Sequence, residues 1–384
     1  MTSGSIQPDD FLPVIASNYV PQGRTNVLAL AHLHMKANWH PAPVHSFTLP
    51  LWYRGTYDEQ QAARERAVIF DRSHLGRFYV TGAQATDVLR RIFATEPLRI
   101  APKQIGRAIA CREHGRILDI VTLCHLEEGR WLVITGPQGQ NSVRAAVEAA
   151  VQPDEDVVVR DRLGESVLLT VVGPMAAQML EAVVGPTIPG AVPDGEAHEI
   201  LLGGYRALVA HDHELSEDGY WFVLSPEVGE HLWENSLTAG IEPAGLAAWD
   251  TMRLEAGAIE APTETPPPAT PYHAGLGALV DLSEDRPFPG SEALEHVHEV
   301  DRVLVGLRLD GPRLAKRASR ITANGVEIGA CVNAVYSGAL GTGIALAYLP
   351  PGLARVEVDT DGVMQPADVV PLPFIAAARR NLGR

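Results

Sequence analysis

The chain mixes stretches whose apolar residues recur with helical spacing and stretches that alternate with period two. Helical spacing predicts helices at residues 58–67, 85–94 and 142–151. Residues 117–136 contain two β-branched runs separated by the turn at residues 127–129, which predicts a β-hairpin. Strands, helices and hairpins then follow one another again from residue 167. This mixture favours α+β layers over a doubly wound parallel sheet.

Three other segments have a different pattern. Residues 1–46 carry scattered prolines and little periodicity, so we expect an extension wrapped on the surface or against a neighbour. Residues 260–273 are rich in proline, which predicts a nonhelical, extended crossing segment. From residue 303 onward, short apolar runs are broken by glycine and proline, which predicts a small barrel or sandwich.

Composition and charge exclude several classes of protein. A length of 384 residues suggests two or three domains. The net charge is 31 − 47 = −16, and no run of lysine and arginine exceeds two residues, so a nucleic-acid partner is not expected. The chain shows neither a signal sequence nor an apolar stretch of roughly 18 residues. We therefore expect a cytoplasmic protein that neither leaves the cell nor enters a membrane.

Neither a metal site nor a disulfide framework is expected. The three cysteines, Cys111, Cys124 and Cys331, are scattered and lack Cys-x-x-Cys spacing, which is typical of a reducing compartment. The histidines at residues 32, 34, 40 and 45 lack the spacing of a convergent ligand set, so we expect ordinary polar contacts there. Phosphate-loop, nucleophile-elbow and zinc-protease motifs are absent from the sequence. Pattern and composition alone therefore reach only a soluble α+β protein with a C-terminal β domain.

Several short blocks carry a family resemblance. RLEAG at residues 253–257, followed fourteen residues later by PYHAGLG at residues 271–277, resembles the RLEAG…TPxxAGLG block of the aminomethyltransferase family, the T-protein of the glycine cleavage system and its relatives. Other blocks resemble that family in the same order: FDRSHLG at 70–76, VGP at 172–174, FPGSEAL at 288–294, LVGL at 304–307 and GIALA at 343–347.

The resemblance implies a fold and an activity. It implies an α+β, three-domain T-protein-like fold around a central hole, divided into the N-terminal extension 1–46, a folate-binding region 47–298 of two interleaved α+β domains, and a C-terminal β-barrel domain 299–384. It also implies a tetrahydrofolate in the hole and the passage of a one-carbon unit between a folate nitrogen and a small-molecule substrate. The resemblance does not decide whether the protein forms a homo-oligomer.

One carboxylate is the expected catalytic group. In the family, the second aspartate of a hairpin sits beside the reacting folate nitrogen, and Asp119 is expected in that role. A carboxylate within the apolar run Ile117, Leu118, Ile120 and Val121 has a shifted pKa, which suits proton transfer or charge stabilisation at an amine. The alternative is a strand residue that faces solvent or caps the hairpin.

The expected folate pocket departs from the family pattern at three positions. Thr135 stands where the family has asparagine, Trp221 where it has the glutamate for the pterin, and Trp249 where it has an arginine, whereas Arg253 remains. An indole cannot replace the paired hydrogen bonds that a carboxylate accepts, because its only polar group is an N–H donor. The two tryptophans either make the pocket flatter and more apolar, or fill the core.

The remaining polar residues define how the cofactor would be held. We expect Glu217, Tyr220 and Arg253 to hold it, with Thr135, Trp221 and Trp249 in the same pocket. Either Glu217 or Glu214 takes over the lost carboxylate contact, or the pocket has taken another ligand.

Three functions follow. The first is a demethylase that moves a methyl group from a small O-, N- or S-methylated substrate to tetrahydrofolate. The second is a folate-independent enzyme for a small apolar or aromatic substrate with Asp119 as acid or base, or a glycine-cleavage aminomethyltransferase. That last activity needs a lipoyl carrier protein, and residues 258–270 do not support such a partner. The third is a non-catalytic binding or assembly factor. The iron–sulfur-related branch of the family carries a KGCYxGQE-type motif, which this chain lacks, so this function ranks last.

Overall fold

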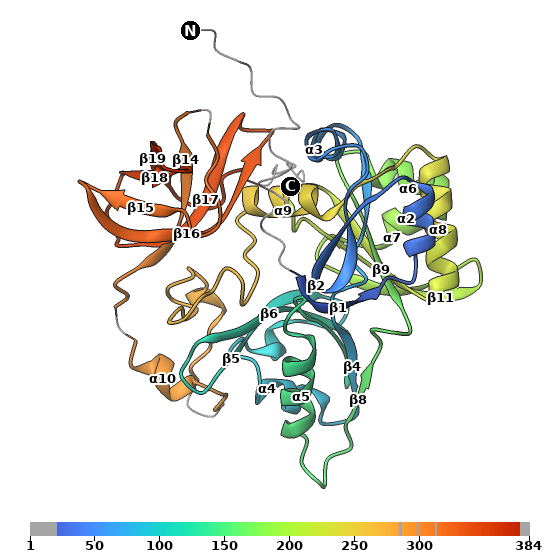
Figure 1. The fold of residues 1–384 in the computed structure, drawn as a ribbon. Coiled ribbons are helices and arrows are strands. Elements are labelled where there is room, and N and C mark those ends of the chain that lie inside the picture. The colour runs from blue at the N-terminus through green and yellow to red at the C-terminus, as the bar shows by residue number, and fades with distance from the viewer. Residues whose placement is uncertain (1–20, 284–285, 298, 312, 377–384) are drawn as a thin grey trace, which may run out of the picture.

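The computed structural model describes residues 21–283, 286–297, 299–311 and 313–376. A barrel, a six-stranded sheet with its helices and a five-stranded sheet with its helices are arranged around helix α9 (Leu246–Glu255), as Figure 1 shows. This arrangement confirms the predicted α+β fold with a C-terminal β-barrel.

The N-terminal segment supplies a ribbon and part of the core. Strand β1 (Pro21–Val27) pairs in parallel with β2 (His40–Trp52), and α2 (Ala31–Lys36) lies between them. Leu30 and Leu33 are buried against the six-stranded sheet. The expected boundary at residue 46 falls inside β2, because that strand continues into the body of the protein.

The six-stranded sheet packs against helices on both of its faces, and one of these faces also meets the other sheet. Its strands, in spatial order, are β10 (Ala197–Leu202), β11 (Tyr205–Asp212), β12 (Gly219–Leu224), β9 (Val167–Val172), β3 (Val68–Asp71) and β13 (Glu242–Pro243). The helices of this part are α3 (Thr56–Glu65), α6 (Ala176–Val184), α7 (Thr187–Ala191) and α8 (Pro226–Thr238). Side chains alternate along a strand. Tyr220 and Phe222 therefore join the cluster with α6 and α8, whereas Trp221 and Val223 join the core shared with the five-stranded sheet.

The predicted hairpin lies at the centre of the five-stranded sheet. In spatial order its strands are β5 (Ile105–Cys111), β6 (Ile117–Glu127), β7 (Arg130–Ile134), β4 (Arg77–Thr81) and β8 (Val158–Asp161). Helices α4 (Ala85–Arg90) and α5 (Gln140–Ala150) cover its outer face through Val88, Leu89, Val143 and Val147. The hairpin over residues 117–136 is confirmed, with its turn between β6 and β7.

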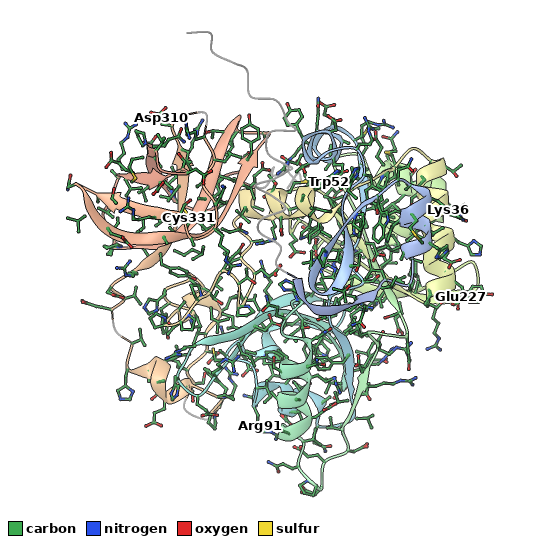
Figure 2. The ribbon with its side chains drawn as sticks, viewed as in Figure 1. Lys36, Trp52, Arg91, Glu227, Asp310 and Cys331 are labelled. Atoms are coloured by element: carbon green, nitrogen blue, oxygen red, sulfur yellow. The ribbon has the colours of Figure 1, made fainter. Side chains whose placement is uncertain are left out.

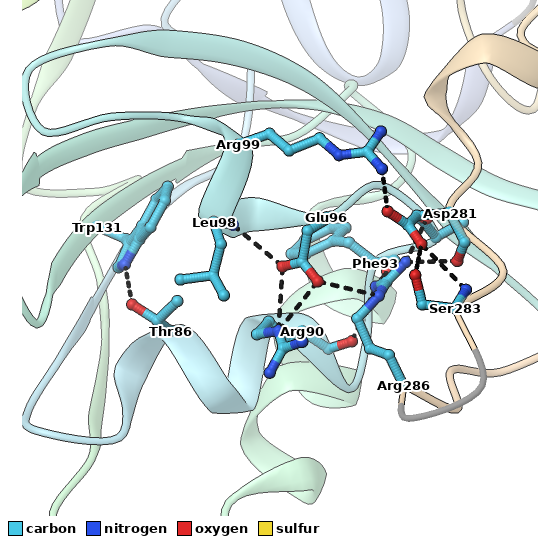
Figure 3. Close-up of polar contacts among 11 residues, drawn as sticks. Thr86, Arg90, Phe93, Glu96, Leu98, Arg99, Trp131, Asp281, Ser283 and Arg286 are labelled. Atoms are coloured by element: carbon cyan, nitrogen blue, oxygen red, sulfur yellow. Dashed lines mark hydrogen bonds and ion pairs between the residues drawn. The ribbon is translucent and has the colours of Figure 1, made fainter.

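The segment after α9 runs to the barrel through turns and short helices. Its regular elements are the 3-10 turn η3 (Gly277–Leu279) and α10 (Ser291–Glu295), and η2 (Pro97–Arg99) lies beside it. Arg286 fixes this segment to α4 by donating to the carbonyls of Arg90, Phe93 and Ala94, while its Nε lies 3.3 Å from Glu96 (Figure 3).

The C-terminal strands close into a barrel. Its strands are β14 (Val303–Leu309), β15 (Arg320–Ala323), β16 (Val326–Ser337), β17 (Thr342–Leu349), β18 (Arg355–Asp359) and β19 (Met364–Val370). They close in the order β14-β17-β16-β15-β18-β19, with β19 pairing back onto β14. Of the two predicted forms, the barrel is therefore the one that forms, and closure removes every free sheet edge.

Charged side chains project from the periphery of the part that holds the six-stranded sheet, as Lys36 and Glu227 do in Figure 2, and from the barrel, as Asp310 does. Among the described residues, we find no helix of sufficient length and apolar character to span a bilayer.

Candidate active site

A cavity of about 320 Å³ lies where the three parts meet, and we call it the central cavity. Each part contributes to its wall. The polar side chains around it are His45, His74, Gln138, Asp250, Arg253, Glu260, Thr263, Arg317 and Asn333. Two smaller spaces of about 60 and 30 Å³ share part of this wall and are lined by Trp249 and Glu260. The site is therefore polar and charged.

Arg253 joins the wall of the cavity to the barrel. From α9, its two terminal nitrogens each lie 2.8 Å from one Glu264 oxygen, and its Nε lies 2.8 Å from Asp250. The Asn333 amide of β16 donates to the same Glu264 carboxylate at 2.6 Å. Burial lowers the pKa of Arg253, but Glu264 and Asp250 outweigh it and hold that pKa above its ordinary value. The sequence-predicted Arg253 thus lies in the wall as a fully paired cation.

Glu260 is the carboxylate common to the central cavity and both side spaces. Its Oε1 lies 3.8 Å from the Nε2 of His45, which β2 holds with a positive φ of 52°. Burial raises the pKa of Glu260, but His45 and Arg253 outweigh burial and keep that pKa below its ordinary value. Glu260 is therefore ionised at neutral pH and faces the cavity.

His74 supplies a neutral imidazole beside this carboxylate. It is buried, and none of the described residues bonds to its Nδ1. Burial lowers the pKa of His74 to about 3, and the nearby Arg72 lowers it further against the opposing effect of Glu260. Because an unpaired buried nitrogen costs free energy, this Nδ1 can take a hydrogen-bond partner that none of the described residues supplies.

Asp119 lies behind the wall of the cavity. Its Oδ2 accepts from the Gly136 N–H at 3.0 Å and its Oδ1 from the Ile120 N–H at 2.9 Å, and it is completely buried. A Cβ on Gly139 would overlap this carboxylate. Along β6, the residues that reach the cavity side are Ile120 and Thr122. Asp119 is not among the residues that line the central cavity or its side spaces, and its role stays a prediction.

The position of Asp119 perturbs its ionisation. Burial raises the pKa of Asp119 to about 7, and the Gly136 and Ile120 N–H groups only partly offset this. The carboxyl therefore exchanges its proton near neutral pH, as expected from a carboxylate in an apolar strand.

Three other predicted residues meet in the side space of about 60 Å³: Thr135, Trp249 and Arg253. Glu214 joins them, with its carboxylate 2.9 Å from Arg72. The Arg72 guanidinium also lies 3.7 Å from the centre of the Trp249 ring. That face of Trp249 is therefore already covered by a cation.

The structure does not bring Glu217, Tyr220 or Trp221 to this cavity wall. Glu217 pairs with Arg64 at 2.8 Å. Tyr220 stacks on His211 in the helix-covered core, with 4.3 Å between ring centres. Trp221 lies in the core between the sheets and donates to Asp212 at 2.9 Å. Of the two readings of Trp221, core filling is the one that the structure supports, and cofactor roles for these three side chains stay predictions.

Sequence reasoning missed Glu260 and His45 as site residues. His45 comes from β2 and Glu260 from the proline-rich crossing segment, and the two residues are more than 200 positions apart in the sequence. The one available signal was an acidic residue three positions after the RLEAG block, within the segment whose composition departs from the family.

The fold and the charged cavity at the meeting of three parts define the class of protein, and comparisons with known proteins agree. The GCVT N-terminal domain model matches residues 30–284, and the glycine cleavage T-protein C-terminal barrel domain model matches residues 302–375. The crystal structure of glycine cleavage system aminomethyltransferase T from Bartonella henselae is similar, with a TM-score of 0.85 over 92% of this chain and 98% of that one, at 24% identity.

Curated relatives lead to the same family. An aminomethyltransferase from Streptomyces coelicolor is 34% identical over 347 residues, covering 85% of this chain and 91% of the relative. One from Rubrobacter xylanophilus is 32% identical over 343 residues, covering 87% and 90%. The chain belongs to the aminomethyltransferase (glycine cleavage T-protein) family of folate-dependent one-carbon transferases.

Proposed function

We propose that this protein removes a methyl group from a small O-, N- or S-methylated substrate and transfers it to tetrahydrofolate. The observation that carries this proposal is the polar cavity of about 320 Å³, which admits a small molecule and has the ionised Glu260 in its wall. Tetrahydrofolate, when bound, supplies the amine nitrogen that takes up the one-carbon unit.

The residues of the side space fit a folate. Glu214 presents an acceptor carboxylate of the kind that binds a pterin edge by paired hydrogen bonds, and Arg72 fixes its position at 2.9 Å. Burial raises the pKa of Glu214, but Arg72 and Arg107 outweigh it, so that the pKa lies below its ordinary value. Thr135 lies in the same wall. Of the two glutamates considered for the lost contact, we assign the role to Glu214.

Glu260 is the proposed proton acceptor. The bond between the methyl carbon and the substrate oxygen, nitrogen or sulfur breaks as the amine nitrogen takes up the methyl group and loses a proton. An ionised carboxylate in the cavity can accept that proton and pass it to the departing oxygen or nitrogen, whereas a sulfonium donor departs as a neutral thioether. His45, 3.8 Å away, stabilises the ionised form. His74 is neutral at the same wall, so its imidazole can accept or donate a hydrogen bond without adding charge.

Asp119 enters the proposal as a positioning residue. Its carboxylate holds the Gly136 N–H, and Gly136 belongs to the wall of the side space. It is separated from the cavity by that backbone, so it acts on a ligand through the shape of the turn at residues 136–139.

Calorimetric titration with tetrahydrofolate tests the proposed binding. The wild type should bind, Glu214→Gln should bind at least about 10-fold more weakly because one charged hydrogen-bond partner is lost, and Glu217→Gln should bind as the wild type does. No binding by the wild type at high micromolar folate would refute folate dependence. Equal loss in both variants would refute the assignment of Glu214.

Turnover separates the two roles of the carboxylates. With a panel of methylated donors and tetrahydrofolate, Glu260→Gln should lower kcat by about 100-fold or more, as for loss of a general base. Asp119→Asn should lower kcat/KM modestly and leave the pH inflection of turnover in place. If Asp119→Asn abolishes turnover together with an inflection near pH 7, Asp119 is itself the acid or base.

A folate-independent enzyme is the second candidate, because Trp249, which stands where the family has an arginine, lines both side spaces. The position of Asp119 away from the cavity side of β6 does not favour Asp119 as the acid or base of such an enzyme. It predicts turnover of a small substrate without added folate. An aminomethyl carrier protein as the accepted donor, in place of free methylated compounds, would instead indicate the glycine-cleavage reaction.

A further inference from the structure

We propose that Asp194, His211 and His213 form a site for one divalent transition-metal ion, with Zn²⁺ as the best-suited ion. The three side chains offer ligand atoms that lie within 4.8 Å of one another. None of them lines the central cavity or its side spaces. The site is therefore separate from the proposed one-carbon chemistry and does not depend on it.

The hydrogen bonds of the two histidines point both Nε2 atoms at carboxylates. His211 Nδ1 lies 3.2 Å from the Val192 carbonyl, and His213 Nδ1 lies 3.2 Å from the Glu217 carbonyl. A carbonyl oxygen only accepts, so each Nδ1 carries a hydrogen and, in the neutral ring, each Nε2 keeps its lone pair. Backbone carbonyls on the far nitrogen are what orient metal-binding histidines.

Those two lone pairs face negative oxygens. His213 Nε2 lies 3.3 Å from Asp194 Oδ1, and His211 Nε2 lies 2.6 Å from Asp218 Oδ1. A neutral imidazole nitrogen and a carboxylate oxygen repel each other, so each contact needs a cation between or on them. One divalent ion bound by both imidazoles and a carboxylate would supply that positive charge. Imidazole and carboxylate together are a ligand set that suits Zn²⁺.

The backbone holds the two imidazoles on one side. His211 is the second-last residue of β11, and His213 follows directly after that strand. The His211 ring stacks on Tyr220 of β12 and is largely buried, and its centre lies 5.4 Å from that of His213. Residues two apart on an extended strand project to the same side. The intervening Asp212 instead accepts from Trp221, on the opposite side. Asp194 comes from the turn before β10, so the ion would join two segments that are distant in the chain.

A bound ion would restrain the loop between β11 and β12. That loop carries Asp218, which is placed to become a fourth donor, and also Glu214, which lines the side space of the cavity. The ion would thus act as a structural clamp on the outer side of a loop whose inner side forms part of the active-site wall. Such a closed set of protein ligands is typical of structural zinc sites.

Calorimetric titration of the untagged, chelator-treated full chain with ZnCl₂ tests the site. We expect one ion per chain with a Kd in the micromolar range or tighter, and a higher Tm in its presence. Addition of Co²⁺ should give the visible absorption of a four-coordinate ion. The absence of saturable uptake up to about 100 μM Zn²⁺ would overturn the proposal.

Variants locate the ion. His213→Gln, at an exposed position, should bind Zn²⁺ more weakly by more than the roughly 10-fold that loss of an outer-shell partner costs, and Asp194→Asn should follow it. His198→Gln is the matched control, because His198 faces a single carboxylate, Glu196, at 2.6 Å, without a second imidazole. If His213→Gln binds like the wild type, or if His198→Gln loses binding equally, the ion is not at this site.

Discussion

Two buried arginines, Arg253 and Arg286, carry the same side chain and are almost equally buried, but their roles in the structure differ. Arg286 is 3% exposed, and its terminal nitrogens donate to four backbone carbonyls, those of Arg90 at the end of α4, Phe93, Ala94 and Asp281. Arg253 is 5% exposed and donates mainly to the carboxylates Asp250 and Glu264. A guanidinium that meets carbonyls fastens chain segments together, whereas one that meets carboxylates sets the charge of a cavity.

The position of each arginine supports this distinction. Figure 3 shows Arg286 among Arg90, Glu96 and Asp281, with each contact serving the junction of the connecting segment and α4. Arg253 lies in the wall of the central cavity, and its partner Glu264 receives a further bond from the barrel residue Asn333. Burial alone therefore does not identify a functional arginine; the nature of its acceptors does.

The largest expected effect comes from Arg253→Met. It leaves the fully buried Glu264 without its cation, so the free energy of unfolding should fall by about 4 kcal/mol. Urea denaturation measures this. Arg253→Met combined with Glu264→Gln should recover part of the loss, because the unpaired buried charge is then absent. A double variant no more stable than the single one would contradict the explanation.

Arg286→Met should have a somewhat smaller effect. The substitution leaves buried carbonyl groups, rather than an ionised carboxylate, without a hydrogen-bond donor. We therefore expect the free energy of unfolding to fall by about 3 kcal/mol in the same denaturation experiment. The folded variant should bind tetrahydrofolate as the wild type does, since Arg286 is remote from the cavity wall. A change in folate affinity comparable to that of Arg253→Met would remove the distinction between the two arginines.

The sequence predicted the elements better than it predicted the site. The hairpin over residues 117–136 and the barrel strands follow from period-two patterns and glycine turns, which are local signals. Which face of β6 meets the cavity is not local: Asp119 and Ile120 are adjacent, and only the packing of the barrel and α9 against the sheet decides between them. A shift of one residue moves a side chain to the opposite face.

The two candidate glutamates of one loop illustrate the same limit. Ser216 adopts a positive φ of 62°, and beyond it Glu217 turns to Arg64, whereas Glu214 stays at the cavity with Arg72. A left-handed serine has no clear sequence signature. His45 and Glu260 meet only because the N-terminal ribbon packs against the crossing segment, a long-range contact that no motif encodes.

The raised pKa of Asp119 predicts a pH-dependent change in the free energy of unfolding that is smaller than the effects of the two arginine substitutions. Its pKa is raised to about 7 by burial, so the folded state binds more protons than the unfolded state above about pH 4. The contribution of Asp119 to stability is therefore complete at low pH and declines as the pH rises toward 7. Between pH 5.5 and 7 the wild type should lose about 2 kcal/mol relative to Asp119→Asn.

Urea denaturation of the wild type and of Asp119→Asn across this pH range measures the difference in their free energies of unfolding. Titrations of groups that both proteins share cancel in this difference. The change with pH is the relevant quantity, because a constant offset reflects only the altered hydrogen bonds to Gly136 and Ile120. A difference that does not vary with pH would mean that Asp119 is ionised throughout the range.

The smallest expected effect concerns a third arginine, which combines both kinds of contact. Arg72 pairs with Glu214 and lies 3.7 Å from the centre of the Trp249 ring, so its stacking should add to its ion pair. Lysine keeps the charge but not the planar group. A double-mutant cycle of Arg72→Lys and Trp249→Phe should give a coupling free energy of about 1 kcal/mol by urea denaturation. The same cycle in a Glu214→Gln background should keep this coupling if stacking is its source, and a coupling that vanishes there would assign it to the ion pair instead.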